Sequence, residues 1–510
     1  MVSQNNFPVK AQLTPKQDTT PFGGVLPFLK IVGDLKILHR LPCDRTRSQG
    51  WLDAQMVLSI MLLNILGFDR VADIDHLEDD TDLCMTVRRL ELKLYGRRRA
   101  TLSARLRRGR NRTFPSQRTV HDWLSRYHDD AAAQARIKDQ VYIPPPAQEL
   151  QSLHLINKFL ITQQITTRGV KHLTIDIDAT IIPSGKKECL PIYRVTTGKV
   201  PYETGYQPLM GYSPELDMIL HTEMRDGNVP ASQDILRFLV EVLEMLPASI
   251  TSVLVRMDSA GYQHEFMNYC NGPLRRSAEL QRFDTIRFVC AVAKTHAAMD
   301  DIRATPAADW QPCPSGTPGL SVAELSHVPN KVATRPKDER MRYLAYRQEV
   351  NGLGIGHDEV EGGHWEGVGP SQMRLLVTNY PAVGEGDGSE PEMDPWSVRE
   401  EANQRCGDSE QAHAVVKDDY AGGMMPSGRF GSNSCWLFLA CLSQNFVAYC
   451  RPLMTDGMVW LRARMKAFRA MFIYRSARLV KHSNQFILKF AATDSGQLER
   501  GWSPLFRLRI

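Results

Sequence analysis

The stretch His172-Leu-Thr-Ile-Asp176-Ile-Asp178-Ala-Thr180 decides the fold, because apolar and polar residues alternate along it as in a buried β-strand. Side chains along a strand alternate between its two faces, so Asp176 and Asp178 project to the same side. Two carboxylates on one face repel each other unless a cation or bound protons compensate their charge. The segment is therefore either a strand with a cation-binding face or an edge strand with one face in water.

Two further acidic residues stand in contexts that complement this pair. Asp258 follows the apolar run 252–257 and precedes Ser-Ala-Gly, at the end of a strand where open α/β sheets place their ligands. Glu410 lies within 405–417, whose spacing predicts a helix. Carboxylates are the ligands that hold Mg²⁺ or Mn²⁺ near phosphates. Two such ions about 4 Å apart can hold both the attacking and the leaving oxygen when a phosphodiester reacts. Alone, each acid has an ordinary interpretation as a solvated side chain.

The surrounding sequence predicts a mixed α/β core. An almost wholly apolar core helix is expected at 51–66. The expected strands are 172–182, 206–213, 217–224, 251–257, 285–290 and 374–378. The other expected helices are 150–167, 231–246, 396–419, 433–452 and 457–472. Residues 297–372 interrupt this pattern with Pro, Gly and scattered strand-like runs, and we interpret them as an insertion.

The order of a strand Asp, a strand-end Asp and a helical Glu after a long insertion is that of the ribonuclease-H-like fold. The chain resembles the DDE-type transposases of bacterial insertion sequences, in the branch with D-x-D-x-T, R-x-D-S-G-[FY] and R-G-D-x-E motifs. Asp176-Ile-Asp178-Ala-Thr180 matches the first motif, and Arg256-Met-Asp258-Ser-Ala-Gly-Tyr262 matches the second with Ala260 as an extra residue. Further similar segments are Gly205-Tyr-Gln-Pro-Leu209 and Arg225-Asp-Gly-Asn228.

The third motif departs from the family pattern. Cys406 stands where the family generally has Arg, with Arg405 one position earlier, while Glu410 and the downstream Lys417 are present. The resemblance implies that Asp178, Asp258 and Glu410 are catalytic and hold two Mg²⁺ ions, for which Mn²⁺ substitutes. Asp178 is preferred over Asp176 as the catalytic metal ligand, because the ligand of the family stands two positions before the Thr of the motif. Asp176 is either a further ligand or a supporting residue.

The resemblance also implies a division of the chain. We expect a flexible N-terminus (1–20), a mainly helical DNA-binding region (21–167), a catalytic core in two parts (168–296 and 373–453) around the insertion (297–372), and a basic C-terminal tail (454–510). The implied function is binding of terminal inverted repeats, followed by metal-dependent cleavage and strand transfer. The expected partners are double-stranded transposon-end and target DNA, handled by a homodimer or a larger synaptic complex.

Positive charge gathers in one part of the chain. Residues 88–118 hold twelve Arg or Lys and one acid, Glu91. Such a run can neutralise several DNA phosphates, and the alternative is a solvated arm. The DNA-binding candidates are Arg97, Arg98, Arg99, Arg107, Arg108, Arg110, Arg118, Arg405 and Lys417.

The composition is that of a globular protein, with 43% hydrophobic and 23% charged residues and a formal net charge of +5. The ten cysteines form no CxxC pair, and we see no signal peptide or membrane span, so a cytoplasmic protein is expected. The family resemblance implies that it is bacterial and associated with the nucleoid. The His357–His364 segment has zinc-type ligands but a Gly-rich setting that favours a turn, and Trp365 either packs or stacks on a base.

Two other functions fit the same residues. The Cys406 and Ala260 departures are consistent with a catalytically inactive, domesticated DNA-binding protein or repressor. A ribonuclease-H-like, structure-specific nuclease would share the carboxylates, although the basic N-terminal region favours the transposase.

Overall fold

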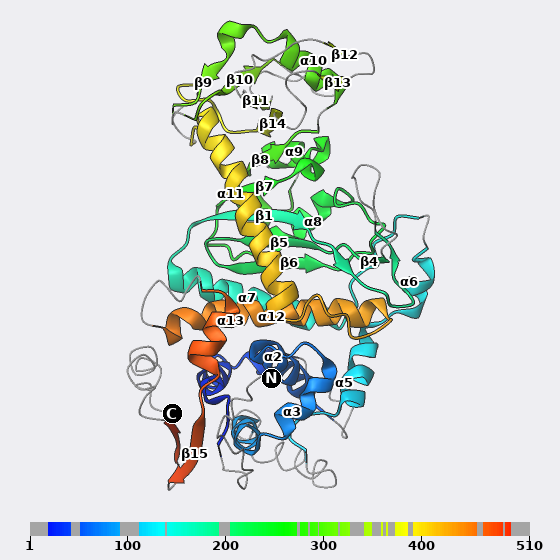
Figure 1. Ribbon diagram of the computed structural model, residues 1–510, viewed down its shortest axis with the longest axis vertical. Coiled ribbons are helices and arrows are strands. Elements are labelled where there is room, and N and C mark those ends of the chain that lie inside the picture. Colours follow the sequence, from blue (N-terminus) through cyan, green and yellow to red (C-terminus); the bar gives the residue numbers. More distant parts are fainter. Residues whose placement is uncertain are drawn as a thin grey trace, which may run out of the picture. The chain divides into compact units, whose positions relative to one another are not determined.

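The chain divides by its internal contacts into two compact units (Figure 1). The helical unit comprises 1–66, 71–117 and 450–510, and the sheet unit comprises 67–70 and 118–449. The computed structural model describes residues 19–41, 51–91, 112–137, 140–192, 204–272, 276–283, 286–293, 295–314, 317–326, 341–348, 359–360, 364–365, 373–385, 391–455, 463–482 and 485–490.

The helical unit is built around α2 (Asp53–Leu66), in which every residue after Asp53 is buried, as expected for a core helix. Its other elements are α1 (Leu26–Asp34), α3 (Ile74–Glu78), a helix at 81–91, α13 (Met465–Phe468) with a following π turn (Arg469–Ile473), and the hairpin of β15 (Ala477–His482) and β16 (Gln485–Phe490). Arg469 donates hydrogen bonds of 2.8 Å to the carbonyls of Asn64 and Ile65 in the last turn of α2, where helical carbonyls commonly accept from outside the helix.

The boundaries expected from the sequence differ from this division. Residues 118–167 belong by their contacts to the sheet unit, and 454–510 belong to the helical unit. The first difference has a visible cause in α7 (Leu150–Arg168), whose Asn157 donates to the carbonyl of Leu220 at 3.0 Å. The helix ends at Gly169, whose φ of +66° is the left-handed conformation that glycine adopts without strain.

A nine-stranded sheet forms the second unit. In spatial order its strands are β6 (Met218–Glu223), β5 (Leu209–Ser213), β1 (His172–Ala179), β7 (Ser252–Met257), β8 (Arg287–Ala291), β14 (Met373–Thr378), β11 (Arg342–Gln348), β10 (Leu320–Leu325) and β9 (Gln311–Pro312). β1 pairs antiparallel with β5 and parallel with β7, which is parallel to β8, while β5 and β6 are antiparallel. This order around β1 is ribonuclease-H-like and confirms the predicted fold class.

The segment expected to be an insertion carries strands that extend the sheet. β9, β10 and β11 lie within 297–372 and continue the sheet beyond β14 as antiparallel strands. β12 (Glu359–Val360) pairs with β13 (His364–Trp365) apart from that sheet, and α10 (His296–Ala304) precedes β9. Most of 327–372 lies outside the described residues.

The first expected strand is shorter than its sequence pattern. β1 ends at Ala179, and β2 (Ile182–Pro183) joins β4 (Thr204–Tyr206) and β3 (Leu190–Pro191) in a separate three-stranded sheet. The expected strand 206–213 is likewise divided between β4 and β5. Pro208 lies at this break and has no N–H to donate to a sheet, although its carbonyl accepts from Thr180 at 3.0 Å.

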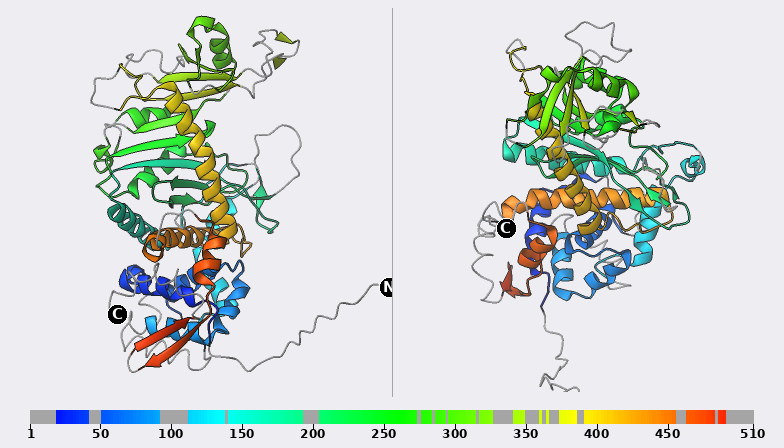
Figure 2. Two further views of the ribbon diagram at one scale, coloured as in Figure 1. Left: turned by 60° about the vertical axis from the view of Figure 1, so that its left-hand side comes forward. Right: turned by 45° about the horizontal axis from the view of Figure 1, so that its top comes forward.

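Helices cover both faces of the large sheet. α11 (Pro395–Ala414) runs along one face, as Figures 1 and 2 show. It continues as a π turn (Val415–Asp419). α8 (Ile235–Glu244) lies on the other face, where its Val242 and Phe238 pack against Gly211 of β5. Gly211 pairs with Ile177 of β1, whose side chain points to the face opposite that of Asp176 and Asp178. The remaining helices of the unit are α5 (Gln117–Leu124), α6 (Asp130–Ala135), α9 (His264–Asn271) and most of α12 (Phe430–Met454).

Buried polar contacts protect the β6 edge of the sheet. Asn445 of α12 accepts a hydrogen bond from the backbone N–H of Ile219 at 2.8 Å and donates to Asn157 at 2.7 Å. These contacts satisfy backbone groups that an edge strand would otherwise leave open. Among the described helices, none has the length and apolar character needed to cross a membrane.

Candidate active site

Strand register brings two of the predicted catalytic acids together. β1 and β7 are parallel, and Ile177 is paired with Met257, so Asp178 and Asp258 follow at neighbouring strand ends. Asp178 keeps 19% of its side chain exposed, and Asp258 is half-buried. The structure therefore places both carboxylates at the carboxyl edge of the sheet, where solvent and a ligand can reach them.

Asp258 is held by the turn that follows β7. Its side chain accepts a hydrogen bond from the backbone N–H of Ala260 at 2.9 Å and so caps the short 3₁₀ turn Ser259–Gly261. Burial raises the pKa of Asp258, and the negative charge of Asp178 raises it further, whereas the Ala260 N–H and Arg405 oppose the shift. Ala260, the extra residue of the motif, thus supplies a backbone donor that fixes this carboxylate.

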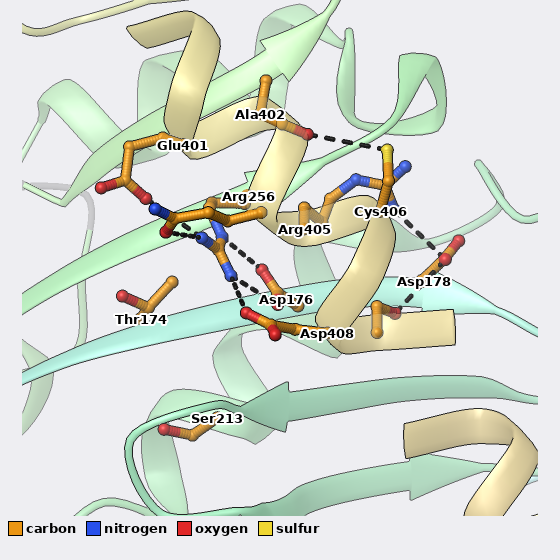
Figure 3. Close-up of polar contacts among 12 residues, drawn as sticks. Thr174, Asp176, Asp178, Ser213, Arg256, Glu401, Ala402, Arg405, Cys406 and Asp408 are labelled. Carbon is orange, nitrogen blue, oxygen red and sulfur yellow. Dashed lines mark hydrogen bonds and ion pairs between the residues drawn. The ribbon is translucent and has the colours of Figure 1, made fainter. Parts of the chain in front are cut away.

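Helix α11 brings a positive charge onto the aspartate pair (Figure 3). Nη1 of Arg405 lies 3.1 Å from Oδ2 of Asp178, and the hydroxyl of Ser409 donates to the same oxygen at 3.3 Å. Burial opposes the charge of Arg405, but Asp178 and then Asp258 outweigh it and raise the pKa of the guanidinium. Arg405 is therefore a charged group facing both aspartates.

Asp176 has a different partner from Asp178, although both project from the same face of β1. Arg256, its neighbour in register on β7, donates from Nε to Oδ1 at 2.6 Å and from Nη2 to Oδ2 at 2.8 Å. The Asp176 and Arg256 side chains are 0% and 2% exposed. Burial opposes the charge of Arg256, yet Asp176 holds the pKa of the guanidinium above its ordinary value. Burial also raises the pKa of Asp176, and the hydrogen bonds and charge of Arg256 oppose that shift and favour the ionised pair.

Arg256 also contacts α11 at three positions, Glu401, Gln404 and Asp408, spaced about one turn apart. Its Nη1 lies 3.1 Å from Oε2 of Glu401 and 3.2 Å from Oε1 of Gln404, and its Nη2 lies 3.4 Å from Oδ2 of Asp408. Figure 3 shows Arg256 between the strand carrying Asp176 and this helix. The guanidinium thus links β1, β7 and α11 and fixes which face of α11 meets the sheet.

Glu410, the third predicted catalytic acid, is exposed. It follows Ser409 by one position, so its side chain leaves the helix about 100° further round the axis. Among the residues that the structure describes, no three His, Cys, Asp or Glu side chains are placed to hold one metal ion. The structure therefore gathers Asp178 and Asp258 but not Glu410.

Further along α11, a buried histidine lies near two of the predicted DNA-binding residues. Burial, together with the charges of Lys417 and Arg405, lowers the pKa of His413 to about 4. His413 is therefore neutral near neutral pH. Lys417 lies in the π turn after α11, a kind of irregularity that is frequent at functional sites.

The other predicted DNA-binding residues are more dispersed. Arg118 is 92% exposed on α5 and lies 3.8 Å from Asp122. Arg97, Arg98, Arg99, Arg107, Arg108 and Arg110 lie outside the described residues, as does His357. Trp365 is in β13, and the structure does not describe its side chain. Cys406 is exposed, and its thiol approaches the carbonyl of Ala402 at 3.6 Å, so Arg405 is the residue that reaches the acids.

The carboxylate pair fits a divalent cation. Carboxylate oxygens are hard ligands, and the influence of Asp178 on the pKa of Asp258 shows that the two charges interact closely. Arg405 is a positive charge that compensates them in this structure. Asp178 and Asp258 are thus the residues that would hold a metal ion.

Sequence reasoning missed the roles of several residues. Arg256 was visible in the second motif, but its partner depends on strand register, which no local pattern provides. Glu401, Asp408 and Ser409 could be placed on a helix from their spacing. Only the rotation of that helix decides which of them meet Arg256 and Asp178.

The fold and site together define a ribonuclease-H-like protein with paired aspartates at adjoining strand ends. The family model of the transposase DDE domain, group 1, matches residues 32–287, about half of the 510-residue chain, and includes Asp178 and Asp258. The chain belongs to this transposase family.

Comparison with solved structures gives a similarity to a piggyBac transposase in a synaptic complex with hairpin DNA, determined by cryo-EM. The sequence identity is 12% and the TM-score 0.41, and the match covers 88% of this chain and 79% of the other. No curated protein matched the sequence.

Proposed function

We propose that this transposase belongs to an insertion sequence, binds its terminal inverted repeats and cleaves and joins DNA at Asp178, Asp258 and Glu410. The observation that carries the proposal is the placement of Asp178 and Asp258 at adjoining ends of β1 and β7. Arg405 faces both acids from α11, and the sheet order is ribonuclease-H-like. Membership of the DDE transposase family supports the same chemistry.

Two Mg²⁺ ions, or Mn²⁺ in their place, would activate water or a 3′-hydroxyl and neutralise charge on the phosphate. In the protein itself, Asp178 and Asp258 orient their oxygens through Ser409 and the Ala260 N–H. Arg405 and Lys417 supply positive charge along α11 for DNA phosphates. No covalent protein–DNA intermediate is part of this proposal.

Glu410 and Asp176 have different roles in the proposed site. Glu410 completes the acid set in the DNA-bound protein, which requires a change in α11 because the side chain is exposed here. Asp176 supports the site and does not bind metal, because both of its oxygens accept hydrogen bonds from Arg256 and both side chains are buried.

The proposed partners are transposon-end and target DNA. The basic run that includes Arg97–Arg99 and Arg107–Arg110 would bind phosphates and give salt-dependent affinity. A homodimer or larger synaptic complex is proposed because two transposon ends must be handled together.

Excision of a marked element from a plasmid tests the proposal in cells. Asp258→Ala and Glu410→Ala should each abolish excision, while Glu400→Ala, which removes another exposed glutamate of α11, should leave it unchanged. Undiminished excision in either catalytic variant would remove that residue from the proposed site. Specific end binding without cleavage by the wild-type protein would favour the catalytically inactive alternative, and preferential cleavage of hybrid or branched substrates would favour the nuclease.

A further inference from the structure

Both carboxylate oxygens of Asp178 have contacts with protein groups in this structure. Its Oδ1 accepts the backbone N–H of Ala179 at 3.0 Å, and its Oδ2 faces both Arg405 and Ser409. Asp258, its neighbour in strand register, is within electrostatic range of the same guanidinium. A cation that binds Asp178 must therefore replace contacts that the carboxylate already has.

The contact between Arg405 and Asp178 is the kind that can be exchanged. The separation is 3.1 Å, but Nη1 of Arg405 has no hydrogen-bond partner among the described residues, so the contact is an ion pair without hydrogen-bond geometry. The two side chains keep 12% and 19% of their surface exposed, although Nη1 itself is buried. Without hydrogen-bond geometry the pair is held by charge, and a cation that binds the carboxylate supplies the same compensation.

The Asp176–Arg256 pair, two positions earlier on β1, shows the contrast. It has two hydrogen bonds of 2.6 and 2.8 Å, is almost wholly buried, and shares its guanidinium with α11. Breaking such a pair leaves an uncompensated buried charge, which is strongly unfavourable. The same strand thus carries one permanent ion pair and one that is open to exchange.

We propose that Arg405 is the internal counter-ion of the Asp178–Asp258 pair, that a divalent cation displaces it, and that it thereby sets the metal affinity of the DNA-free protein. The inference rests on the proposed function, in which these two acids hold metal. Displacement replaces the single positive charge of the guanidinium with the double charge of the cation at the two carboxylates. It also frees the guanidinium for a phosphate group of the DNA.

Mn²⁺ binding to the full-length, DNA-free protein tests this, with free Mn²⁺ measured by electron paramagnetic resonance. Arg405→Gln should bind Mn²⁺ about tenfold more tightly than the wild type, within the usual range of coupling between linked events. Arg405→Lys, which keeps the charge, should bind close to the wild type. Arg399→Gln removes one positive charge from the same helix and serves as the matched control.

The outcomes separate this inference from the proposed function. If Asp178→Asn abolishes Mn²⁺ binding but Arg405→Gln binds no more tightly than Arg399→Gln, the counter-ion role is wrong and the metal site stands. If the wild type and Arg405→Gln bind no more Mn²⁺ than Asp178→Asn does, the metal site and the counter-ion role both fail. A loss of affinity in Arg405→Gln would show a supporting role instead and overturn the inference.

Thermal unfolding provides a second reading and also shows whether each variant is folded. Without metal, Arg405→Gln should unfold at a lower temperature than Arg399→Gln, because the two carboxylates lose their counter-charge. Mn²⁺ should then raise its melting temperature by more than it raises that of the wild type, since a ligand stabilises the state that binds it. An equal or smaller rise would contradict the proposal.

Discussion

At the scale of single residues, the two aspartates of the D-x-D motif have separate tasks. Alternation along β1 correctly predicted that Asp176 and Asp178 share a face. It could not predict that Asp176 meets Arg256 while Asp178 meets Arg405, because both partners come from distant segments. A local pattern gives the direction of a side chain, and tertiary register gives its partner.

The Asp176–Arg256 pair should contribute strongly to stability. Asp176→Asn removes one charge of a buried ion pair and should lower the free energy of unfolding by about 3–5 kcal/mol. Urea unfolding followed by circular dichroism measures this. Asp300→Asn, which removes the exposed partner of Arg303, is the control and should change stability by less than about 1 kcal/mol. Equal effects of the two substitutions would contradict the role given to Arg256.

Asp258 should have the opposite effect on stability. Burial and the charge of Asp178 raise its pKa, so its contribution to stability is present below the ordinary aspartate pKa and declines as the pH rises through the raised value. Without metal, Asp258→Asn should therefore be more stable than the wild type near neutral pH. The gain should shrink near pH 4, which is close to the ordinary aspartate pKa of about 3.9. Urea unfolding at both pH values tests this, and a loss of stability at neutral pH would contradict it.

At the scale of elements, α11 positions the site. Its first two turns pack on β8, β10, β11 and β14 through Val398 and Ala402, and Gln404 and Ser409 further along meet Arg256 and Asp178. Spacing correctly predicted a helix over 396–419, but a period of 3.6 residues does not reveal the π turn at its end. The rotation that exposes Glu410 follows from packing and could not be predicted from the sequence.

The start of α11 offers a test of this role. Asp394 accepts hydrogen bonds from the backbone N–H groups of Trp396 and Ser397 at 2.8 and 3.2 Å. Burial opposes its charge, but the contacts with Ser397 and Trp396 outweigh burial and lower its pKa. Asp394→Ala should lower the free energy of unfolding by about 1 kcal/mol at neutral pH, and Asp394→Ser should restore most of it. Urea unfolding of the three proteins measures these differences.

The sign of the pH dependence follows from the lowered pKa of Asp394. Its contribution is present above the ordinary aspartate pKa and is lost as the pH falls through the lowered value. The difference between wild type and Asp394→Ala should therefore disappear in strong acid. A difference that stays constant over the acid range would mean that the carboxylate does not cap α11.

The strands beyond β14 show another limit of sequence patterns. Residues 297–372 were expected to be an insertion, and β9, β10 and β11 within them extend the sheet of the core. Each strand-like run was visible locally. Antiparallel pairing of β11 with β14 joins segments separated by a stretch without a clear pattern, so their pairing could not be predicted from the residues alone.

At the scale of the whole molecule, the distribution of charge leads to a prediction about DNA binding. The net charge is +5, but twelve basic residues fall within 88–118. Replacing Arg97, Arg98 and Arg99 together by Ala should weaken binding of any DNA sequence. It should also reduce the slope of log affinity against log salt by about 0.9 for each phosphate that the variant no longer neutralises. Fluorescence anisotropy over a salt series measures the slope, and an unchanged slope would mean that these arginines do not bind DNA.

If the acids of this transposase cut DNA, the purified full-length protein should nick an end-labelled inverted-repeat fragment in the presence of Mn²⁺. We expect nicking at the transposon end by the wild type and by Glu400→Ala. We expect none by Asp178→Asn, Asp258→Asn or Glu410→Gln, each of which replaces a carboxylate of the proposed site with an amide. Nicking by all of these variants at the wild-type rate, or none by the wild type, would show that these acids do not cut DNA.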